Sequence, residues 1–197
     1  MVPPVEKFMS RMRAMGVGDG HQVVVYDQVG VSSAPRVWWL FKLMGQENVA
    51  VLDGGLPKWV AEGRNTEDLP PMVRDRHMTV RVQNHLVKDV TQVSSASKLG
   101  DYEIVDARSR GRFAGTEPEP RAGLRGGHIP NSKNVPFGEL LTEQKTLKSP
   151  DELRSVFEAA GVDLSKPVIT SCGSGITAAI LSLALERIGK TDHAVYD

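Results

Sequence analysis

The chain has 197 residues, with 24 Lys and Arg side chains against 24 Asp and Glu, and 40% of its residues are hydrophobic. Because these charges cancel, no bulk electrostatic field favours binding to nucleic acid or to an anionic membrane surface. The one cysteine excludes an internal disulfide, and no apolar run reaches the roughly 18 to 20 residues that a membrane-spanning helix requires.

A strand-loop-helix-strand pattern occupies residues 22–63. Runs of β-branched and apolar residues predict its two strands, and an apolar segment opened by Ala34-Pro35 predicts its helix. In chain order, the expected elements are a strand at 23–26, a helix at 34–44 and a strand at 49–52. Asp27 ends the first strand, and Asp53-Gly54-Gly55 ends the second.

A charged segment that contains Pro70-Pro71 follows and is typical of a connector. A helix is predicted at 149–160, and two residues support these bounds: Pro150 lies just inside its start and Gly161 just past its end. Strands that alternate with helices predict an α/β fold, with a parallel sheet covered by helices on both faces. Beyond the connector we expect strands at 78–82, 102–106 and 133–135, helices at 90–99 and 149–160, and a long Gly/Pro/Arg loop between the last two strands.

The first pattern returns at the end of the chain. A strand, a Gly-rich loop, an apolar helix and a second strand follow one another there, at 167–171, 172–177, 178–188 and 194–197. Cys172 lies 145 positions after Asp27. Asp197 lies 144 positions after Asp53, so the two segments align with a difference of one residue in the loop. We therefore predict a tandem repeat of one supersecondary unit.

The two copies differ in what surrounds them. Only 26 residues precede Asp27 in the first copy, too few for the elements that precede the second. The first copy continues beyond its last strand, whereas the second stops at Asp197. We therefore expect an excerpt of a longer protein, truncated at both ends, in which apolar faces around Trp38, Trp39 and Phe41 are exposed.

Cys172 begins a loop whose composition suits a reactive thiolate. A following helix offers the positive end of its dipole and unpaired backbone N–H groups, which favour a negatively charged sulfur. Gly173 and Gly175 allow backbone angles at which successive N–H groups curl toward one anion. Ser174 and Thr177 add hydroxyl groups to the same loop.

Two alternative interpretations of Cys172 are a buried structural cysteine and the nucleophile of a phosphatase. The first is common for a lone cysteine, but glycines, hydroxyl residues and a following helix are atypical of a core position. The second normally requires an arginine six positions after the cysteine to hold the phosphate oxygens, and that position is Ala178. The loop therefore favours a reactive thiolate other than the nucleophile of a phosphatase.

Further motifs accompany this loop along the chain. They are Ser33-Ala34-Pro35-Arg36-Val37-Trp38-Trp39, Asp53-Gly54-Gly55, Asp106-Ala107-Arg108, Gly111-Arg112-Phe113, Gly115-Thr116-Glu117-Pro118-Glu119-Pro120-Arg121, Gly127-His128-Ile129-Pro130 and Asn134-Val135-Pro136-Phe137. With these motifs, the whole chain resembles the tandem rhodanese-domain sulfurtransferases, and most closely the 3-mercaptopyruvate branch. The resemblance implies a rhodanese-like fold, with half of a non-catalytic domain at 1–63, a linker at 64–77 and a catalytic domain without its C-terminal tail at 78–197.

The resemblance also implies a reaction. Cys172 takes sulfur from 3-mercaptopyruvate as a persulfide, releases pyruvate, and passes the sulfur to a thiol, thioredoxin or cyanide. Gly173-Ser174 is the pair of the mercaptopyruvate branch, whereas thiosulfate sulfurtransferases usually carry Arg-Lys there, and a neutral loop suits a singly charged donor. Thiosulfate as the donor, or an inactive truncated module that binds an anion or a partner, remain alternatives. We expect no cofactor, metal, nucleic acid or membrane partner, and a cytoplasmic or mitochondrial location.

The resemblance assigns roles to individual residues. Arg112 and Arg121 hold the carboxylate and keto oxygen of the substrate, since a guanidinium binds a carboxylate bidentately. Ser174 relays a proton together with a histidine and an aspartate that we expect to lie outside this chain. Asp106 supports the loop, and His128 is expected to be structural rather than catalytic. Besides Cys172, the residues of the loop that contact the substrate are Gly173, Gly175, Ile176 and Thr177.

Overall fold

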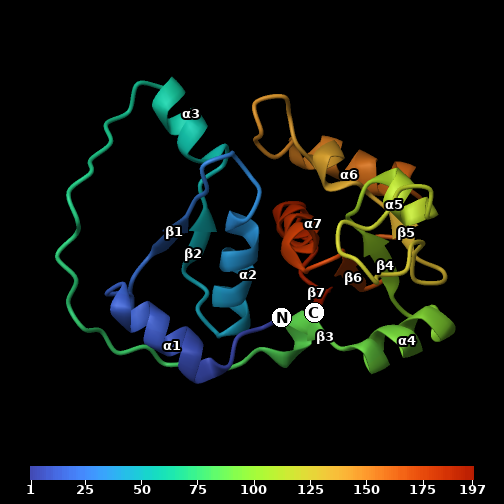
Figure 1. Ribbon diagram of the computed structural model, residues 1–197, viewed down its shortest axis with the longest axis horizontal. Helices are drawn as coiled ribbons and strands as arrows, with labels where there is room; N and C mark the ends of the chain where they lie inside the picture. Colours follow the sequence, from blue (N-terminus) through green and yellow to red (C-terminus); the bar gives the residue numbers. More distant parts are fainter.

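Two parallel β-sheets with packed helices make up the computed structural model, which describes residues 1–197 (Figure 1). The two-stranded sheet pairs β1 (Val23–Val25) with β2 (Val49–Val51). The five-stranded sheet has the order β3-β7-β6-β4-β5, and every pair in it is parallel. The predicted α/β class is confirmed. The strands of the larger sheet are β3 (Val87–Lys88), β4 (Glu103–Asp106), β5 (Lys133–Asn134), β6 (Val168–Ser171) and β7 (His193–Tyr196).

Side-chain capping fixes the start of two helices. The Asp89 carboxylate accepts the backbone N–H of Gln92 before one of them, and the Ser149 hydroxyl accepts that of Glu152 before the other. The predicted helix at 90–99 has the observed bounds, and the one predicted at 149–160 is one residue too long at each end. The helices are α1 (Val5–Ala14), α2 (Ala34–Leu43), α3 (Gly55–Ala61), α4 (Val90–Leu99), α5 (Arg110–Ala114), α6 (Pro150–Ala159) and α7 (Ile176–Arg187), with 3₁₀ turns η1 (Asn84–Leu86) and η2 (Phe137–Leu140).

The units β1–α2–β2 and β6–α7–β7 have the same order of elements, and α2 lies beside α7 (Figure 1). Val23 pairs with Val49 in the first unit, and Val168 pairs with His193 in the second. Equivalent partners lie 145 and 144 positions apart, as in the sequence alignment. The repeat therefore extends to the strand register, whereas the domain boundaries at 63 and 78 stay predictions.

The strand predicted at 78–82 is wrong, because these residues form no regular element. They run past the first unit instead, in the long connection that passes α1 in Figure 1. The backbone N–H of Arg81 donates to the carbonyl of Met44, just past α2, at 3.0 Å. Met78 is 4% exposed and belongs to the same hydrophobic cluster as Phe41. Met78 and Val80 therefore pack against α1 and α2 rather than pair in the larger sheet.

The expectation of exposed aromatic faces on α2 is also wrong. Trp38, Trp39 and Phe41 are only 4%, 0% and 3% exposed. The two tryptophans share a hydrophobic cluster with Ala178 and Ala179 of α7, and α1 and the connection cover Phe41. Because the opposite side of α7 packs into the largest cluster of the chain, this helix is apolar around its whole circumference.

The ends of two central strands define the position of the site. Every residue of β4 and β6 is buried, and the last residues of these strands, Asp106 and Ser171, pair with each other. The loops that follow the two strands therefore meet at one edge of the sheet, where parallel α/β sheets form binding sites. None of the helices is long and apolar enough to cross a bilayer.

Candidate active site

Cys172 follows β6 and begins the loop that leads into α7. Its side chain is half-buried, and Sγ accepts the backbone N–H of Gly175 at 3.0 Å and that of Ser174 at 3.4 Å. Gly175 has a φ of 75°, and this left-handed turn starts α7 at Ile176, two residues before the predicted start. Two backbone N–H groups thus face the sulfur and stabilise negative charge on it.

The first unit provides an internal comparison, because Asp27 stands at the position equivalent to the cysteine. Its carboxylate accepts three backbone N–H groups, from Val29 at 3.0 Å, Ser32 at 2.8 Å and Ala34 at 3.1 Å. In this copy the loop between strand and helix therefore holds a fixed anion. Around Cys172, the equivalent loop presents the N–H groups of Ser174 and Gly175 to a sulfur atom instead.

Arg112, on α5, lies directly against the cysteine loop. Its Nη2 donates to Oε2 of Glu119 at 2.6 Å, and its Nε donates to Oε1 at 3.3 Å. A Cβ placed on Gly173 would lie 2.8 Å from the same Nη2, so a larger residue there would require the end of this arginine side chain to shift. Nη1 makes no hydrogen bond within the chain and remains a free donor.

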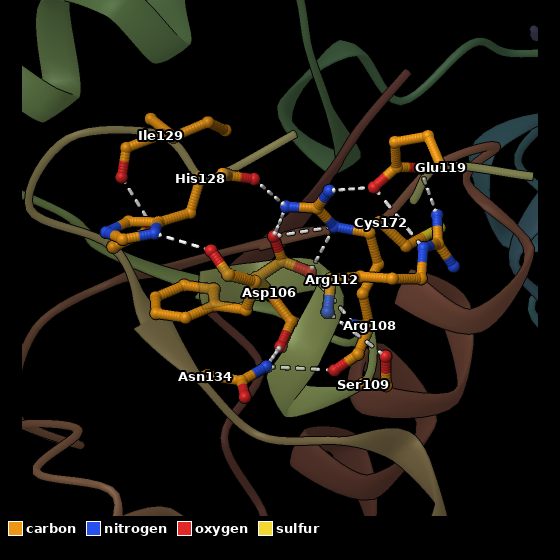
Figure 2. A network of polar contacts seen from close by, with 12 residues as sticks. Asp106, Arg108, Ser109, Arg112, Glu119, His128, Ile129, Asn134 and Cys172 are labelled. Atoms are coloured by element: carbon orange, nitrogen blue, oxygen red, sulfur yellow. Dashed lines mark hydrogen bonds and ion pairs between the residues drawn. The ribbon is translucent and has the colours of Figure 1, made fainter. Parts of the chain in front are cut away.

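Glu119 joins Arg112 to a second arginine (Figure 2). Its side chain is 4% exposed, and Oε1 accepts Nη1 of Arg108 at 2.7 Å. The hydrogen bond from Arg112, supported by that from Arg108, lowers the pKa of Glu119 below its ordinary value. Glu119 was part of a quoted motif but had no predicted role. A carboxylate in a loop rich in arginine is the sequence signal that could have indicated an ion-pair partner.

Asp106 and Arg108 anchor the start of the arginine-rich loop. Asp106 accepts the backbone N–H of Arg108 at 2.9 Å and Nη2 of the same residue at 2.6 Å. Arg108 Nη2 also donates to the carbonyl of Gly127 at 2.7 Å, and Asn134 donates to the carbonyls of Asp106 and Arg108. These bonds tie β4, β5 and both ends of the loop into the network of Figure 2.

Of the cavities that border the cysteine loop, two are also lined by Arg121. The first, of about 350 Å³, is lined by Met1, Arg121, Cys172, Gly173, Ser174, Gly175, Tyr196 and Asp197. The second, of about 140 Å³, is lined by Arg112, Glu119, Pro120, Arg121, Leu124, Gly173, Ser174 and Thr177. Arg121 borders both cavities and forms no ion pair or hydrogen bond with the chain. Ile176 is 41% exposed and lies outside both cavities.

His128 lines another cavity together with Cys172, of about 430 Å³, but other contacts hold its ring. Its Nδ1 bonds to the carbonyl of Phe113 at 2.7 Å, and its ring stacks on that of Phe113 with centroids 3.9 Å apart. These contacts support the structural role expected for it. No group of three or more His, Cys, Asp or Glu side chains is arranged to hold a metal ion.

The parallel sheet, the two related units and a cysteine at a strand end define a class of protein. A family model for the rhodanese-like domain matches residues 3–62 and 89–197. The chain therefore belongs to the rhodanese-like domain family, as the sequence motifs predicted.

Three named sulfurtransferases are similar to the whole chain. The chain is 40% identical over 218 residues to the mitochondrial thiosulfate/3-mercaptopyruvate sulfurtransferase 1 of Arabidopsis thaliana, and the match covers 100% of this chain and 58% of that protein. It is 38% identical over 199 residues to the 3-mercaptopyruvate sulfurtransferase of Homo sapiens, with 100% and 67% covered. It is 40% identical over 200 residues to the thiosulfate sulfurtransferase of Bos taurus, again with 100% and 67% covered.

Two solved structures superpose on the whole chain. SseA from Escherichia coli, a 3-mercaptopyruvate sulfurtransferase with the rhodanese fold, superposes with a TM-score of 0.90 at 37% identity, and the match covers 100% of this chain and 73% of that one. Tum1 from Saccharomyces cerevisiae superposes with a TM-score of 0.88 at 32% identity, with 100% and 70% covered. The chain thus spans between 58% and 73% of the length of the relatives described.

Proposed function

We propose that this chain takes the sulfur atom of 3-mercaptopyruvate onto Cys172 as a persulfide, releases pyruvate, and passes the sulfur to a thiol, thioredoxin or cyanide. One observation carries the proposal. Cys172 Sγ faces the N–H groups of Ser174 and Gly175, at the wall of a cavity shared with the unpaired Arg121. The proposed site thus combines a nucleophile, stabilisation for its negative charge and a cation for the substrate's carboxylate.

In the first step, the Cys172 thiolate attacks the sulfur of 3-mercaptopyruvate. The sulfur–carbon bond breaks, its electron pair forms the enolate of pyruvate, and a proton then converts the enolate to pyruvate. Nη1 of Arg112 and the guanidinium of Arg121 are the free donors for the carboxylate and keto oxygen. The Ser174 hydroxyl, at the same cavity, supplies a route for the proton.

The loop residues and Asp106 complete the proposed site. The backbone N–H groups of the loop hold the persulfide anion after the first step. In the second step, an acceptor thiolate attacks the outer sulfur, the sulfur–sulfur bond breaks, and Cys172 leaves as thiolate. Asp106 supports the site through Arg108, and Thr177 borders the smaller cavity with Arg112. We assign to Ile176, which is exposed, a weaker contact with the substrate.

The donor preference follows from Gly173. An arginine at this position, as expected of thiosulfate sulfurtransferases, would occupy the space of Arg112, whose Nη2 lies 2.8 Å from a Cβ at 173. The unpaired Nη1 of Arg112 beside a neutral loop suits a donor with one carboxylate. Thiosulfate is the second candidate donor, because relatives that carry that name are 40% identical to the chain.

The test is pyruvate release from 3-mercaptopyruvate by the folded chain in the presence of 2-mercaptoethanol. We expect turnover with 3-mercaptopyruvate, slower sulfur transfer from thiosulfate to cyanide measured as thiocyanate, and neither reaction from a Cys172→Ser variant. A folded chain that releases no pyruvate and transfers no sulfur would favour the alternative, a module that binds anions without turnover.

The resemblance to mitochondrial and other relatives also supports a cytoplasmic or mitochondrial location.

A further inference from the structure

Arg36 connects the first unit to the cysteine loop of the second. It lies on α2, is 9% exposed, and its guanidinium stands 4.5 Å from the centroid of the Trp39 ring. Nη1 donates to the carbonyl of Gly175 at 3.4 Å, and Nη2 donates to the carboxylate of Asp197. A buried cation with these two acceptors is a fixed element of the interface between α2 and α7.

The contact reaches the sulfur through one residue. Gly175 accepts from Arg36 through its carbonyl and donates its N–H to Cys172 Sγ at 3.0 Å. A Cβ on Gly175 would lie 2.8 Å from Nη1 of Arg36 and 2.9 Å from Oδ1 of Asp197. The loop therefore packs directly on this ion pair.

Charge gives the contact a second effect. Asp197 lines the same cavity as Cys172, and its side chain is only 6% exposed. Besides Arg36, the cation within reach of this carboxylate is the fully exposed amino group of Met1 at 3.4 Å. Without Arg36, this carboxylate would keep only the exposed amino group of Met1 and the backbone N–H of Val2 as partners, and its charge would disfavour an anionic sulfur at the same cavity.

We propose that Arg36 is a positioning residue for sulfur transfer, which holds the Gly175 N–H on Cys172 and neutralises Asp197 from the first unit. The predicted effect of Arg36 on turnover rests on the proposed function. The predicted effect on the reactivity of Cys172 does not, because it follows from the contact between Arg36 and the loop. Because Cys172 is the only cysteine, the rate at which iodoacetamide alkylates the chain reports the reactivity of this one sulfur without any sulfur donor.

The variants are Arg36→Gln, which removes the charge, and Arg36→Lys, which keeps the charge but loses the fork that spans two acceptors. Lys42→Gln is the matched control. Lys42 also lies on α2 and bonds across to α7, to Glu186 at 3.3 Å, but it does not touch the loop. Urea unfolding of each variant establishes that it is folded before the rates are compared.

We expect Arg36→Gln to slow alkylation of Cys172 by about tenfold, since a displaced Gly175 N–H and a less neutralised Asp197 both disfavour the thiolate, which is the form that iodoacetamide alkylates. In the pyruvate assay kcat falls by a similar factor, with KM changed less than about twofold. Arg36→Lys recovers part of both rates, and Lys42→Gln stays within about twofold of the unmodified chain.

Each arm has an outcome that overturns the proposal. If Cys172 is alkylated as fast in Arg36→Gln as in Lys42→Gln, Arg36 has no positioning role, even where turnover falls. If Arg36→Gln does not fold, Arg36→Lys decides, and an unchanged alkylation rate in that variant overturns the proposal. If the unmodified chain releases no pyruvate, the proposed function fails, whereas the alkylation comparison still tests the contact between Arg36 and the loop.

Discussion

Replacement of Gly173 by alanine tests how closely Arg112 approaches the cysteine loop. The new Cβ would lie 2.8 Å from Nη2 of Arg112, whereas non-bonded heavy atoms prefer separations of about 3.5 Å or more. The loop backbone is held by N–H bonds to Cys172, so the end of the arginine side chain moves instead. A shift of about half an ångström or more is required.

The atom that must move is the one that bonds Glu119 at 2.6 Å. A hydrogen bond that involves a charged group contributes roughly 1.5 to 3 kcal/mol, and Glu119 keeps its second partner, Arg108. We therefore expect a loss of about 1 to 2 kcal/mol in the binding of the donor's carboxylate, which corresponds to a rise in KM of about 5- to 30-fold.

The assay is steady-state pyruvate release over a range of 3-mercaptopyruvate concentrations. Gly138→Ala is the matched control, because a Cβ on Gly138 meets no atom within 4 Å and its φ is not positive. The control should keep the KM of the unmodified chain. A Gly173→Ala variant that also keeps this KM, within about twofold, would refute the assignment of Arg112 to donor binding.

Three further predictions concern the residues around the loop. Arg121→Gln should raise KM for 3-mercaptopyruvate by about tenfold with little change in kcat, because its guanidinium is free to bind the carboxylate in ground and transition states alike; an unchanged KM in the pyruvate assay contradicts this. Because the pKa of Glu119 is lowered, its ion pairs stabilise the fold fully when the pH is above 4.5, the ordinary pKa of a glutamate. This stabilisation is lost as the pH falls below that value. Glu119→Gln should therefore flatten the acid side of the free energy of unfolding measured against pH, and an identical slope argues against the ion pairs. Asp27→Ala should lower the free energy of unfolding in urea by about 1 to 2 kcal/mol, because three backbone N–H groups lose their acceptor; a change below about 0.5 kcal/mol contradicts the cradle described for this loop.

The sequence predicted those features that short stretches of chain determine. The helix at 90–99 has its observed bounds because Asp89 caps it and Gly100 ends it within the same few residues. The repeat was visible because the spacing from Asp27 to Cys172 matches the pairing of the strands on either side. The class of fold followed from this alternation of strands and helices.

Long-range packing explains what the sequence did not predict. Alternating apolar residues at 78–82 look alike whether they pair in a sheet or contact helices, and here they contact α1 and α2. The burial of Trp39 depends on α7, which is distant in sequence.

The site was predicted in part for the same reason. The cysteine loop and the arginines were recognisable as motifs, and the structure brings Arg121 and Ser174 to one cavity with Cys172. The contact between Arg36 and Gly175 joins residues 139 positions apart. No local pattern marks such a partner, because it depends on how α2 and α7 pack against each other.

The central claim is that Cys172 carries sulfur, and the mass of the chain tests it most directly. After exposure to 3-mercaptopyruvate without an acceptor, the account predicts the added mass of one sulfur atom, located on the peptide that contains Cys172, and one pyruvate released for each chain. A Cys172→Ser variant should gain no mass. A folded, unmodified chain that gains no sulfur under these conditions would contradict the account.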